Sequence, residues 1–172
     1  MTSATGEPSD CIFCDASKPG PGHVSNTDLV LFRGRTCYVI LNLFPYNNGH
    51  LMVVPKRHIG SLSATTREER EELMDLTRHA EIALTEAYTP QGINMGINLG
   101  RPAGAGILDH LHIHAVPRWN GDTNFMTVLS DTRVLPESLE ATKKRRYRTT
   151  CLRRYESGSV GYGTTMVMGR DG

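Results

Sequence analysis

The sequence has no excess of charge of one sign and no long apolar run. Its 19 Lys and Arg side chains nearly balance 18 Asp and Glu side chains, which gives a formal net charge of +1 over 172 residues. A nearly neutral chain creates no strong attractive field, so we expect neither nucleic acid nor an anionic membrane surface as a partner. No apolar run approaches the roughly 20 residues of a membrane-spanning helix, so we expect no membrane segment.

Residues 1–10 lack the apolar stretch of a secretory signal peptide. We interpret them as a flexible leader and expect a cytoplasmic protein. Cysteine is also scarce, with four in the chain, but two of them belong to the motif Cys11-Ile12-Phe13-Cys14. In a reducing compartment, such a pair more often binds metal or does redox chemistry than forms a structural disulfide.

Hydrophobic patterning predicts several strands and one long helix. Thr66 and Glu69 predict a capping box at the start of a helix that runs to about Tyr88, with apolar side chains at helical spacing. Runs rich in strand-forming residues predict strands at residues 29–32, 36–42, 50–55 and 93–99. Short connections favour a mostly antiparallel sheet with the helix on one face, which is an α+β architecture.

Three further features carry less information. His79 lies beside the apolar stripe of the long helix, and we interpret it as a surface histidine without a role. Residues 136–146 predict a second helix with Pro136 in its first turn. Residues 147–172 are rich in glycine and have no apolar period, which predicts a disordered or loosely packed tail.

The most informative feature is a row of alternating histidines, His110, His112 and His114. In a β-strand, this alternation places all three imidazoles on one face, with apolar side chains on the other. The row favours either metal binding or covalent catalysis by one imidazole. Because three such residues span about 13 Å of strand, we do not expect one ion to bind all three.

The histidine row resembles the signature of the histidine triad family, in which each of three histidines is followed by apolar residues. Further matching segments are Cys11-Ile12-Phe13-Cys14, Ile40-Leu41-Asn42, Gly49-His50 and Val53-Val54-Pro55-Lys56-Arg57-His58-Ile59. The resemblance covers roughly residues 11–140. It implies a histidine triad domain at residues 11–146, a nucleotide-binding α+β fold, and a homodimer in which the two sheets join.

The family resemblance assigns nucleophilic attack on the α-phosphorus of a nucleotide to His112. A neutral imidazole is nucleophilic near pH 7 without a separate base, because its reference pKa is about 6.5. His114 would then donate a hydrogen bond to a phosphate oxygen or to the leaving group. The glycine-rich loop before the row can present backbone N–H groups from Gly104, Ala105 and Gly106 to phosphate, although an ordinary glycine turn is the alternative.

Other candidate substrate contacts come from the same resemblance. His50 matches a histidine that supports the triad, although a half-buried strand histidine is an equal alternative. Asn42 matches a ribose contact, since an amide can both donate to and accept from hydroxyls; a turn residue at the end of the strand is the alternative. Segments around Asn98, Arg118 and Asn124 look most like a bacterial branch that contains diadenosine tetraphosphate phosphorylases. We therefore assign these three residues to substrate binding. Arg118 and Asn124 are the candidates for contact with the distal phosphates or with the incoming phosphate.

The sequence also departs from other branches. Gly106-Ile107 replaces the phosphate-binding Gln-Ser or Gln-Thr pair that many members carry before the triad. Leu99 stands where the fragile-histidine-triad branch has glutamine. The resemblance therefore does not imply a simple copy of that hydrolase.

A structural zinc site follows from the resemblance to zinc-bearing members. Their ligands match Cys11, Cys14, His58 and His110. Four ligands would close the coordination sphere, so this zinc would hold structure and leave no open position for catalysis. The alternative is a cysteine pair without metal in a mobile leader.

Together these features predict a nucleotidyl hydrolase or transferase that cleaves dinucleoside polyphosphates through a nucleotidyl-His112 intermediate, with an adenine nucleotide as ligand. Phosphate or water can complete the reaction, and we lean slightly toward phosphate. The alternatives are an adenosine phosphoramidase, a non-catalytic nucleotide-binding regulatory module, and a protein that only binds metal.

Overall fold

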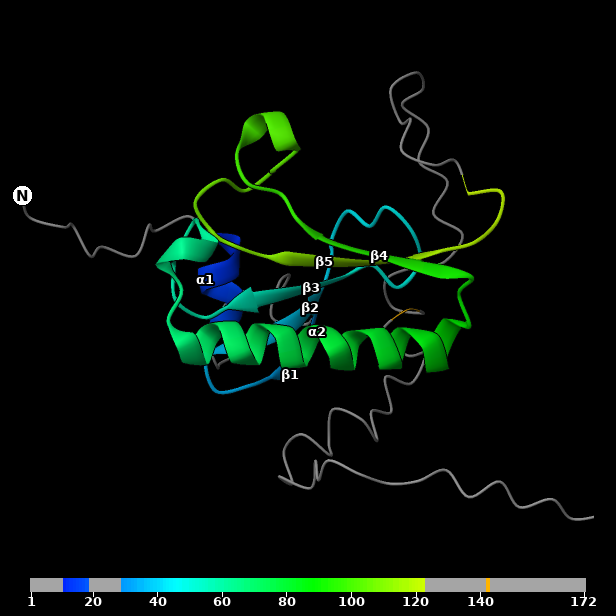
Figure 1. Cartoon of the computed structure of the whole chain (residues 1–172), viewed down its shortest axis with the longest axis horizontal. Helices are drawn as coiled ribbons and strands as arrows, with labels where there is room; N and C mark the ends of the chain where they lie inside the picture. Colours follow the sequence, from blue (N-terminus) through cyan, green and yellow to red (C-terminus); the bar gives the residue numbers. More distant parts are fainter. Residues whose placement is uncertain (1–10, 19–28, 123–141, 143–172) are drawn as a thin grey trace, which may run out of the picture.

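The computed structural model describes residues 11–18, 29–122 and 142 of the chain (Figure 1). The elements in chain order are α1 (Ile12–Ser17), β1 (Val30–Arg33), β2 (Cys37–Leu41), β3 (Leu51–Pro55), η2 (Leu62–Ala64), α2 (Arg67–Tyr88), β4 (Gly92–Ile97), η3 (Arg101–Ala103) and β5 (Ile113–Arg118). The predicted leader, the predicted helix at 136–146 apart from Thr142, Asn124 and the tail at 147–172 lie outside the described residues.

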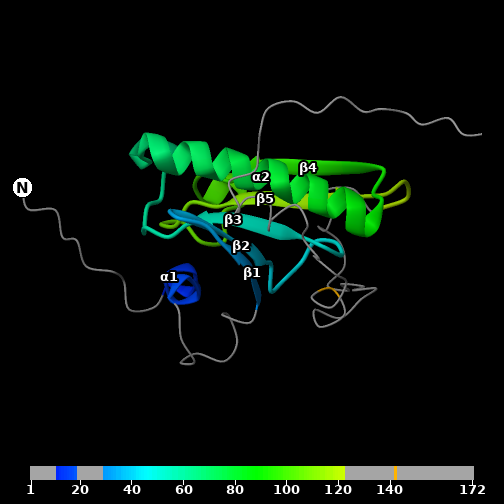
Figure 2. The same cartoon turned by 90° about the horizontal axis from the view of Figure 1, so that it is seen from below.

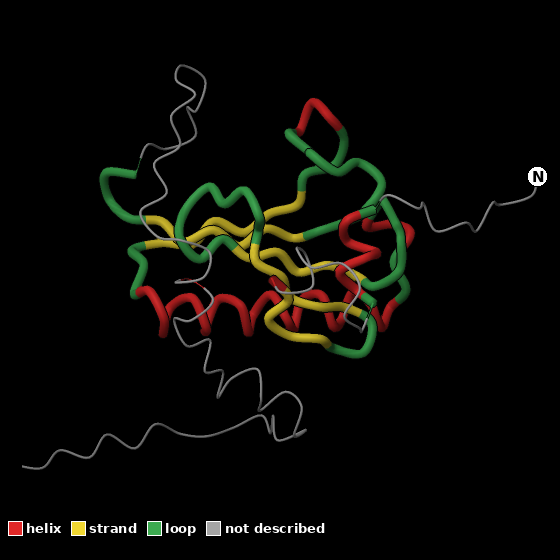
Figure 3. Tube along the Cα trace, turned by 180° about the vertical axis from the view of Figure 1, so that it is seen from behind, coloured by secondary structure: helices red, strands yellow, loops and turns green. Residues whose placement is uncertain are grey.

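Among the described residues, five strands form one sheet in the order β1-β2-β3-β5-β4, and every neighbouring pair is antiparallel. The strands lie side by side with the long helix α2 along them (Figure 3). This arrangement confirms the predicted α+β fold. None of the helices in the described part of the chain is long and apolar enough to cross a membrane.

The sheet has two different faces, which the register of β2 defines. Cys37 lies on the face of α2, since its thiol contacts the Glu69 carbonyl, whereas the next residue, Tyr38, donates a hydrogen bond to the Phe13 carbonyl of α1. Helices α2 and α1 therefore lie on opposite sides of the sheet (Figure 2). All five residues of β2 are buried because both faces are covered. We call the side of Tyr38 the histidine face, because the register places His114 on it.

The long helix begins where the sequence predicts. The Thr66 hydroxyl accepts from the Glu69 N–H, and the Glu69 carboxylate accepts from the Thr66 N–H, which completes the capping box. The interpretation of His79 as a surface residue is wrong, because this side chain is only 3% exposed and its imidazole donates to the Asp75 carbonyl. Helix α2 packs on β2, β3 and β5, so its buried stripe is wide enough to include this position.

The predicted histidine strand is shorter than expected. Strand β5 begins at Ile113, so only His114 of the three histidines lies within it. Before β5 the chain bends away from the sheet, and the Leu111 N–H donates to the Ile59 carbonyl at 2.6 Å. The pairing with the segment after β3 replaces the ladder that a longer strand would make.

Candidate functional site

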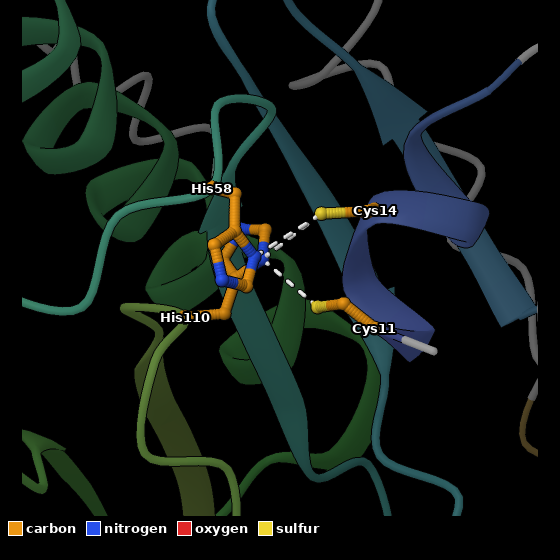
Figure 4. A group of neighbouring side chains, drawn as sticks. All are labelled: Cys11, Cys14, His58 and His110. Atoms are coloured by element: carbon orange, nitrogen blue, oxygen red, sulfur yellow. Dashed lines mark hydrogen bonds between the residues drawn. The ribbon is translucent and has the colours of Figure 1, made fainter. Parts of the chain in front are cut away.

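Four potential metal ligands converge at the end of the histidine face (Figure 4). Cys11 and Cys14 come from the start of α1, His58 from the loop after β3, and His110 from the segment before β5. The ligand atoms all lie within 4.8 Å of one another. We call this group the metal cluster.

The spacing within the metal cluster suits tetrahedral coordination. The Nδ1 atom of His110 lies 3.2 Å from the Cys11 sulfur and 3.6 Å from the Cys14 sulfur, and the Nδ1 atom of His58 lies 3.3 Å from the Cys14 sulfur. Metal–ligand bonds of zinc length give tetrahedron edges of roughly 3.3–3.8 Å. The cluster is therefore a potential metal site, and two thiols with two imidazoles form one of the donor sets of structural zinc.

A backbone carbonyl fixes which nitrogen of His110 can bind metal. The Nε2 atom of His110 lies 2.8 Å from the Pro55 carbonyl oxygen. Because a carbonyl can only accept, Nε2 must carry the proton and donate it. In neutral His110, Nδ1 therefore keeps its lone pair and faces the two cysteines. Such a partner on the far side of the ring is the usual way that proteins orient a metal-binding histidine.

Phe13 connects the metal cluster to the rest of the histidine row. It lies between the two cysteines in sequence, and its side chain is 2% exposed. Its ring centroid lies 5.4 Å from that of His110 and 5.1 Å from that of His112. Helix α1 thus packs against both histidines.

The environment of His112 leaves one nitrogen free to attack. Its Nδ1 donates to the His110 carbonyl at 2.9 Å, so in the neutral ring the lone pair is on Nε2. Burial lowers the pKa of His112 below its usual 6.5, although that hydrogen bond raises it in part. The imidazole is therefore neutral near pH 7, the form in which it can act as a nucleophile.

A chain of hydrogen bonds fixes the opposite role for His114. The Tyr46 backbone N–H donates to Nδ1 of His50 at 3.1 Å, which leaves the proton of neutral His50 on Nε2. That Nε2–H donates to Nδ1 of His114 at 3.0 Å. Neutral His114 must then carry its own proton on Nε2. The ring centroids of His112 and His114 lie 4.7 Å apart, so a ring with a lone pair on Nε2 neighbours a ring with an N–H on Nε2.

Burial keeps this chain uncharged. Burial is the main cause that lowers the pKa of His50 to about 3, and the nearby charges of His114 and Arg118 lower it further. Burial is also the main cause that lowers the pKa of His114 to about 4, with a smaller contribution from the charge of His112. Asn42 also donates its amide to Nδ1 of His50 at 3.3 Å, which places the predicted ribose contact beside the supporting histidine.

The glycine-rich loop is held largely by its own hydrogen bonds. Gly104 has a left-handed φ of 84°, and its N–H donates to the Arg101 carbonyl. The Ala105 N–H donates to the Gly100 carbonyl at 3.3 Å. Of the three backbone groups predicted to bind phosphate, these two are thus used inside the loop, whereas Gly106 is exposed.

Two more predicted substrate contacts lie along the same side of the molecule. Asn98 directly follows β4, and its amide nitrogen is 3.8 Å from where a Cβ on Gly104 would stand. Arg118 ends β5 on the face of His114, and its Nε donates to Asn94 of the neighbouring β4 at 2.7 Å. The sheet therefore brings Asn42, His50, Asn98, His114 and Arg118 to one face.

The sequence reasoning missed two residues of this site. Phe13 was treated only as part of the cysteine motif, although an aromatic side chain between two ligands is a signal for packing beside the cluster. Tyr46 was given no role, but its N–H fixes the tautomer of His50 and its ring centroid lies 4.8 Å from that of His50. Its position in a short turn just before His50 was the available signal.

The chain is similar to known proteins in sequence and in fold. The HIT domain pattern matches residues 24–121. The AP-4-A phosphorylase of Mycobacterium tuberculosis is 46% identical over 116 residues, which are 67% of this chain but only 60% of that protein. The chain therefore matches less than two thirds of the length of this relative.

Two solved structures resemble the fold. A zinc-bound histidine triad family protein from Mycobacterium smegmatis has a TM-score of 0.62 and 28% identity, and covers 86% of this chain and 96% of its own. A hypothetical histidine triad nucleotide-binding protein from Sulfolobus tokodaii has a TM-score of 0.65 and 23% identity, covering 89% of this chain and all of its own (100%). At that identity the second likeness concerns the fold alone.

Proposed function

Because the chain belongs to the HIT domain family, we propose that it cleaves dinucleoside polyphosphates at the α-phosphorus through a covalent nucleotidyl-His112 intermediate. The observation that carries this proposal is the opposite protonation of two neighbouring rings. His112 presents a lone pair on Nε2, and His114 presents an N–H on Nε2. A relative with 46% identity named for phosphorolysis of diadenosine tetraphosphate supports the choice of substrate.

In the first step, Nε2 of His112 attacks the α-phosphorus of diadenosine tetraphosphate. The new N–P bond forms as the bond from the α-phosphorus to its bridging oxygen breaks, and ATP departs. The Nε2–H of His114 donates to the phosphoryl oxygens or to the departing oxygen, where negative charge develops. The ribose of the bound adenylyl group would contact Asn42.

In the second step, inorganic phosphate or water attacks the same phosphorus and releases His112. Phosphate gives ADP, and water gives AMP. The name of the Mycobacterium tuberculosis relative favours phosphate. Arg118 is the described residue that we assign to the distal or incoming phosphate, because a guanidinium is a strong phosphate ligand.

We further propose that the metal cluster holds zinc. Zinc would supply no chemistry to the reaction and would fix α1 to the segment that carries His110. The two thiols, the two Nδ1 atoms and the Pro55 carbonyl behind His110 fit this role. The zinc-bound relative from Mycobacterium smegmatis supports the choice of metal.

We also propose a homodimer through β4. This strand is at the end of the sheet order and pairs only with β5 among the described strands. Most of its residues are exposed, and its sequence, Gly-Ile-Asn-Met-Gly-Ile, has no charged side chain or proline that would protect an open strand edge. Light scattering should give twice the chain mass of 19.0 kDa, and a monomeric mass at working concentration would contradict the dimer.

A single assay tests the proposed reaction. Diadenosine tetraphosphate is incubated with the full chain, with and without inorganic phosphate, and the nucleotides are separated; His112→Ala is run beside it. Phosphate-dependent ADP plus ATP would establish phosphorolysis, and AMP plus ATP without phosphate would establish hydrolysis. No cleavage in either condition would overturn the proposal, and a phosphoramidate substrate would then be tested next.

A further inference from the structure

Tyr46 lies at the rim of the histidine face with one side of its ring covered. Its ring centroid lies 4.8 Å from that of the buried His50, at an interplanar angle of 34°. Its backbone N–H donates to the same imidazole. The residue as a whole is nevertheless 58% exposed. One face of the phenol ring is therefore packed on a fixed imidazole, and the opposite side is open.

The open side lies next to the place where the leaving group departs. The ring centroid of Tyr46 is 6.1 Å from that of His114. In the proposed reaction, His114 donates a hydrogen bond to the phosphoryl group. His114 in turn is 4.7 Å from the ring of the nucleophile His112. A polyphosphate chain that starts at His112 and passes His114 thus comes within reach of Tyr46.

Positive charge lies on the same route. Arg118 shares the sheet face of His114, and its charge contributes to the lowered pKa of His50, the ring that Tyr46 covers. The Nε–H of Arg118 donates a hydrogen bond to the side-chain oxygen of Asn94, which holds the guanidinium in place. An anion that binds Arg118 would therefore lie on the same sheet face as His114, the histidine whose ring Tyr46 contacts.

We propose that Tyr46 is a specificity-determining residue whose exposed ring face stacks on the base of the leaving nucleotide. This inference rests on the proposed cleavage of dinucleoside polyphosphates. Such a substrate has two bases, and only one of them belongs to the nucleotide that becomes attached to His112. Stacking on an aromatic ring depends on the flat face of a base and little on its hydrogen-bonding edge. The site therefore accepts any purine at the far end, and it favours dinucleotides over mononucleotides with the same phosphate chain.

The test compares two substrates that differ at the far end. Diadenosine tetraphosphate carries the second nucleoside, whereas adenosine tetraphosphate has the same first nucleoside and four phosphates without it. The measured quantity is the ratio of kcat/KM for the first substrate to kcat/KM for the second. Tyr46→Ala should lower this ratio about 10-fold, in line with the value of one base stacking on an aromatic ring. Tyr46→Phe should keep the ratio, because the ring remains.

Controls separate stacking from other roles of Tyr46. Alanine keeps the backbone N–H that donates to His50, so the hydrogen-bond chain survives the substitution. Phe44→Ala is the matched control, since Phe44 belongs to the same loop and is 65% exposed; it should leave the ratio unchanged. Melting temperatures verify that each variant is folded.

Several outcomes would overturn the inference. Equal losses on both substrates in Tyr46→Ala would assign the residue to support of His50 instead of base binding. A fall of the kcat/KM ratio in Tyr46→Phe would assign the effect to the hydroxyl group. An equal fall of the ratio in Phe44→Ala would assign it to the loop as a whole. Failure of the wild type to cleave either substrate would overturn the proposed function itself.

Discussion

Two groups of buried or half-buried histidines lie close together in the described part of this protein, and they are prepared for different chemistry. In the metal cluster, His58 and His110 turn their Nδ1 atoms toward two thiols. In the neighbouring group, the hydrogen bonds of His50, His112 and His114 go to backbone groups, to the Asn42 amide and to one another, and His112 and His114 present their Nε2 atoms. For His110, His112 and His114, the hydrogen-bond partner on one ring nitrogen thus decides what the other nitrogen can do.

The largest expected effect comes from removing the nucleophile. His112→Ala should reduce turnover of diadenosine tetraphosphate by at least about 10³-fold, because no other described group offers an unprotonated nitrogen beside the N–H of His114. Nucleotide affinity should remain within a few-fold, as measured by equilibrium titration. The metal content should also remain that of the wild type. Turnover near the wild-type rate would show that covalent catalysis does not pass through this residue.

Removing a thiol should affect metal content and stability more than turnover, which is the opposite of the pattern expected for His112→Ala. Cys14→Ser should lose the bound zinc and lower the melting temperature by about 4–8 °C, as expected if about 2 kcal/mol of stabilisation is lost. Metal analysis and thermal unfolding measure both effects, and EDTA treatment of the wild type should match the variant. Activity should fall less than in His112→Ala, through the contacts of Phe13 with His110 and His112. A variant that retains one zinc per chain would contradict the assignment of the cluster.

A smaller effect is expected from the supporting histidine. His50→Gln removes the imidazole that accepts from Tyr46 and donates to His114, so the proton of His114 is no longer fixed on Nε2. We expect kcat to fall about 10- to 100-fold while zinc content stays unchanged, in line with the loss of an oriented hydrogen-bond donor. Single-turnover kinetics would locate the loss in formation of the nucleotidyl enzyme. Unchanged kinetics would leave His50 as a packing residue.

The smallest effect concerns pH. His50 and His114 have folded-state pKa values lowered to about 3 and about 4, below the ordinary 6.5 of an unfolded chain. Their contribution to stability is therefore present above pH 6.5 and is lost as the pH falls from there toward pH 4, because the unfolded chain takes up protons first. The melting temperature should decline over this window, and His50→Gln should make the decline shallower. Activity should stay level between pH 6 and 8, since both rings remain neutral; a steep fall of kcat below pH 7 would contradict the lowered pKa values.

Periodic patterning predicted the large elements well. The capping residues Thr66 and Glu69 identified the start of α2, and β-forming runs located the strands to within a few residues. These features depend on local preferences that a sequence displays directly. The alternation of the histidines was a weaker guide, because β5 begins only at Ile113 and the N–H of Leu111 donates to the Ile59 carbonyl outside the sheet ladder. A contact between segments far apart in the chain leaves no local signal.

The sequence by itself determined the α+β pattern and, through its resemblance to the histidine triad family, the set of cysteines and histidines that carry the chemistry. The tertiary structure decided which nitrogen of each imidazole is available. The carbonyls of Pro55 and His110 and the N–H of Tyr46 select the tautomers of His110, His112 and His50. The contacts of His112 and His50 come from nearby residues, but the Pro55 carbonyl reaches His110, and His50 reaches His114, only when segments far apart in the chain are brought together in the fold. A tautomer responds to the hydrogen-bond partner that is present in space, so the structure is needed to assign it.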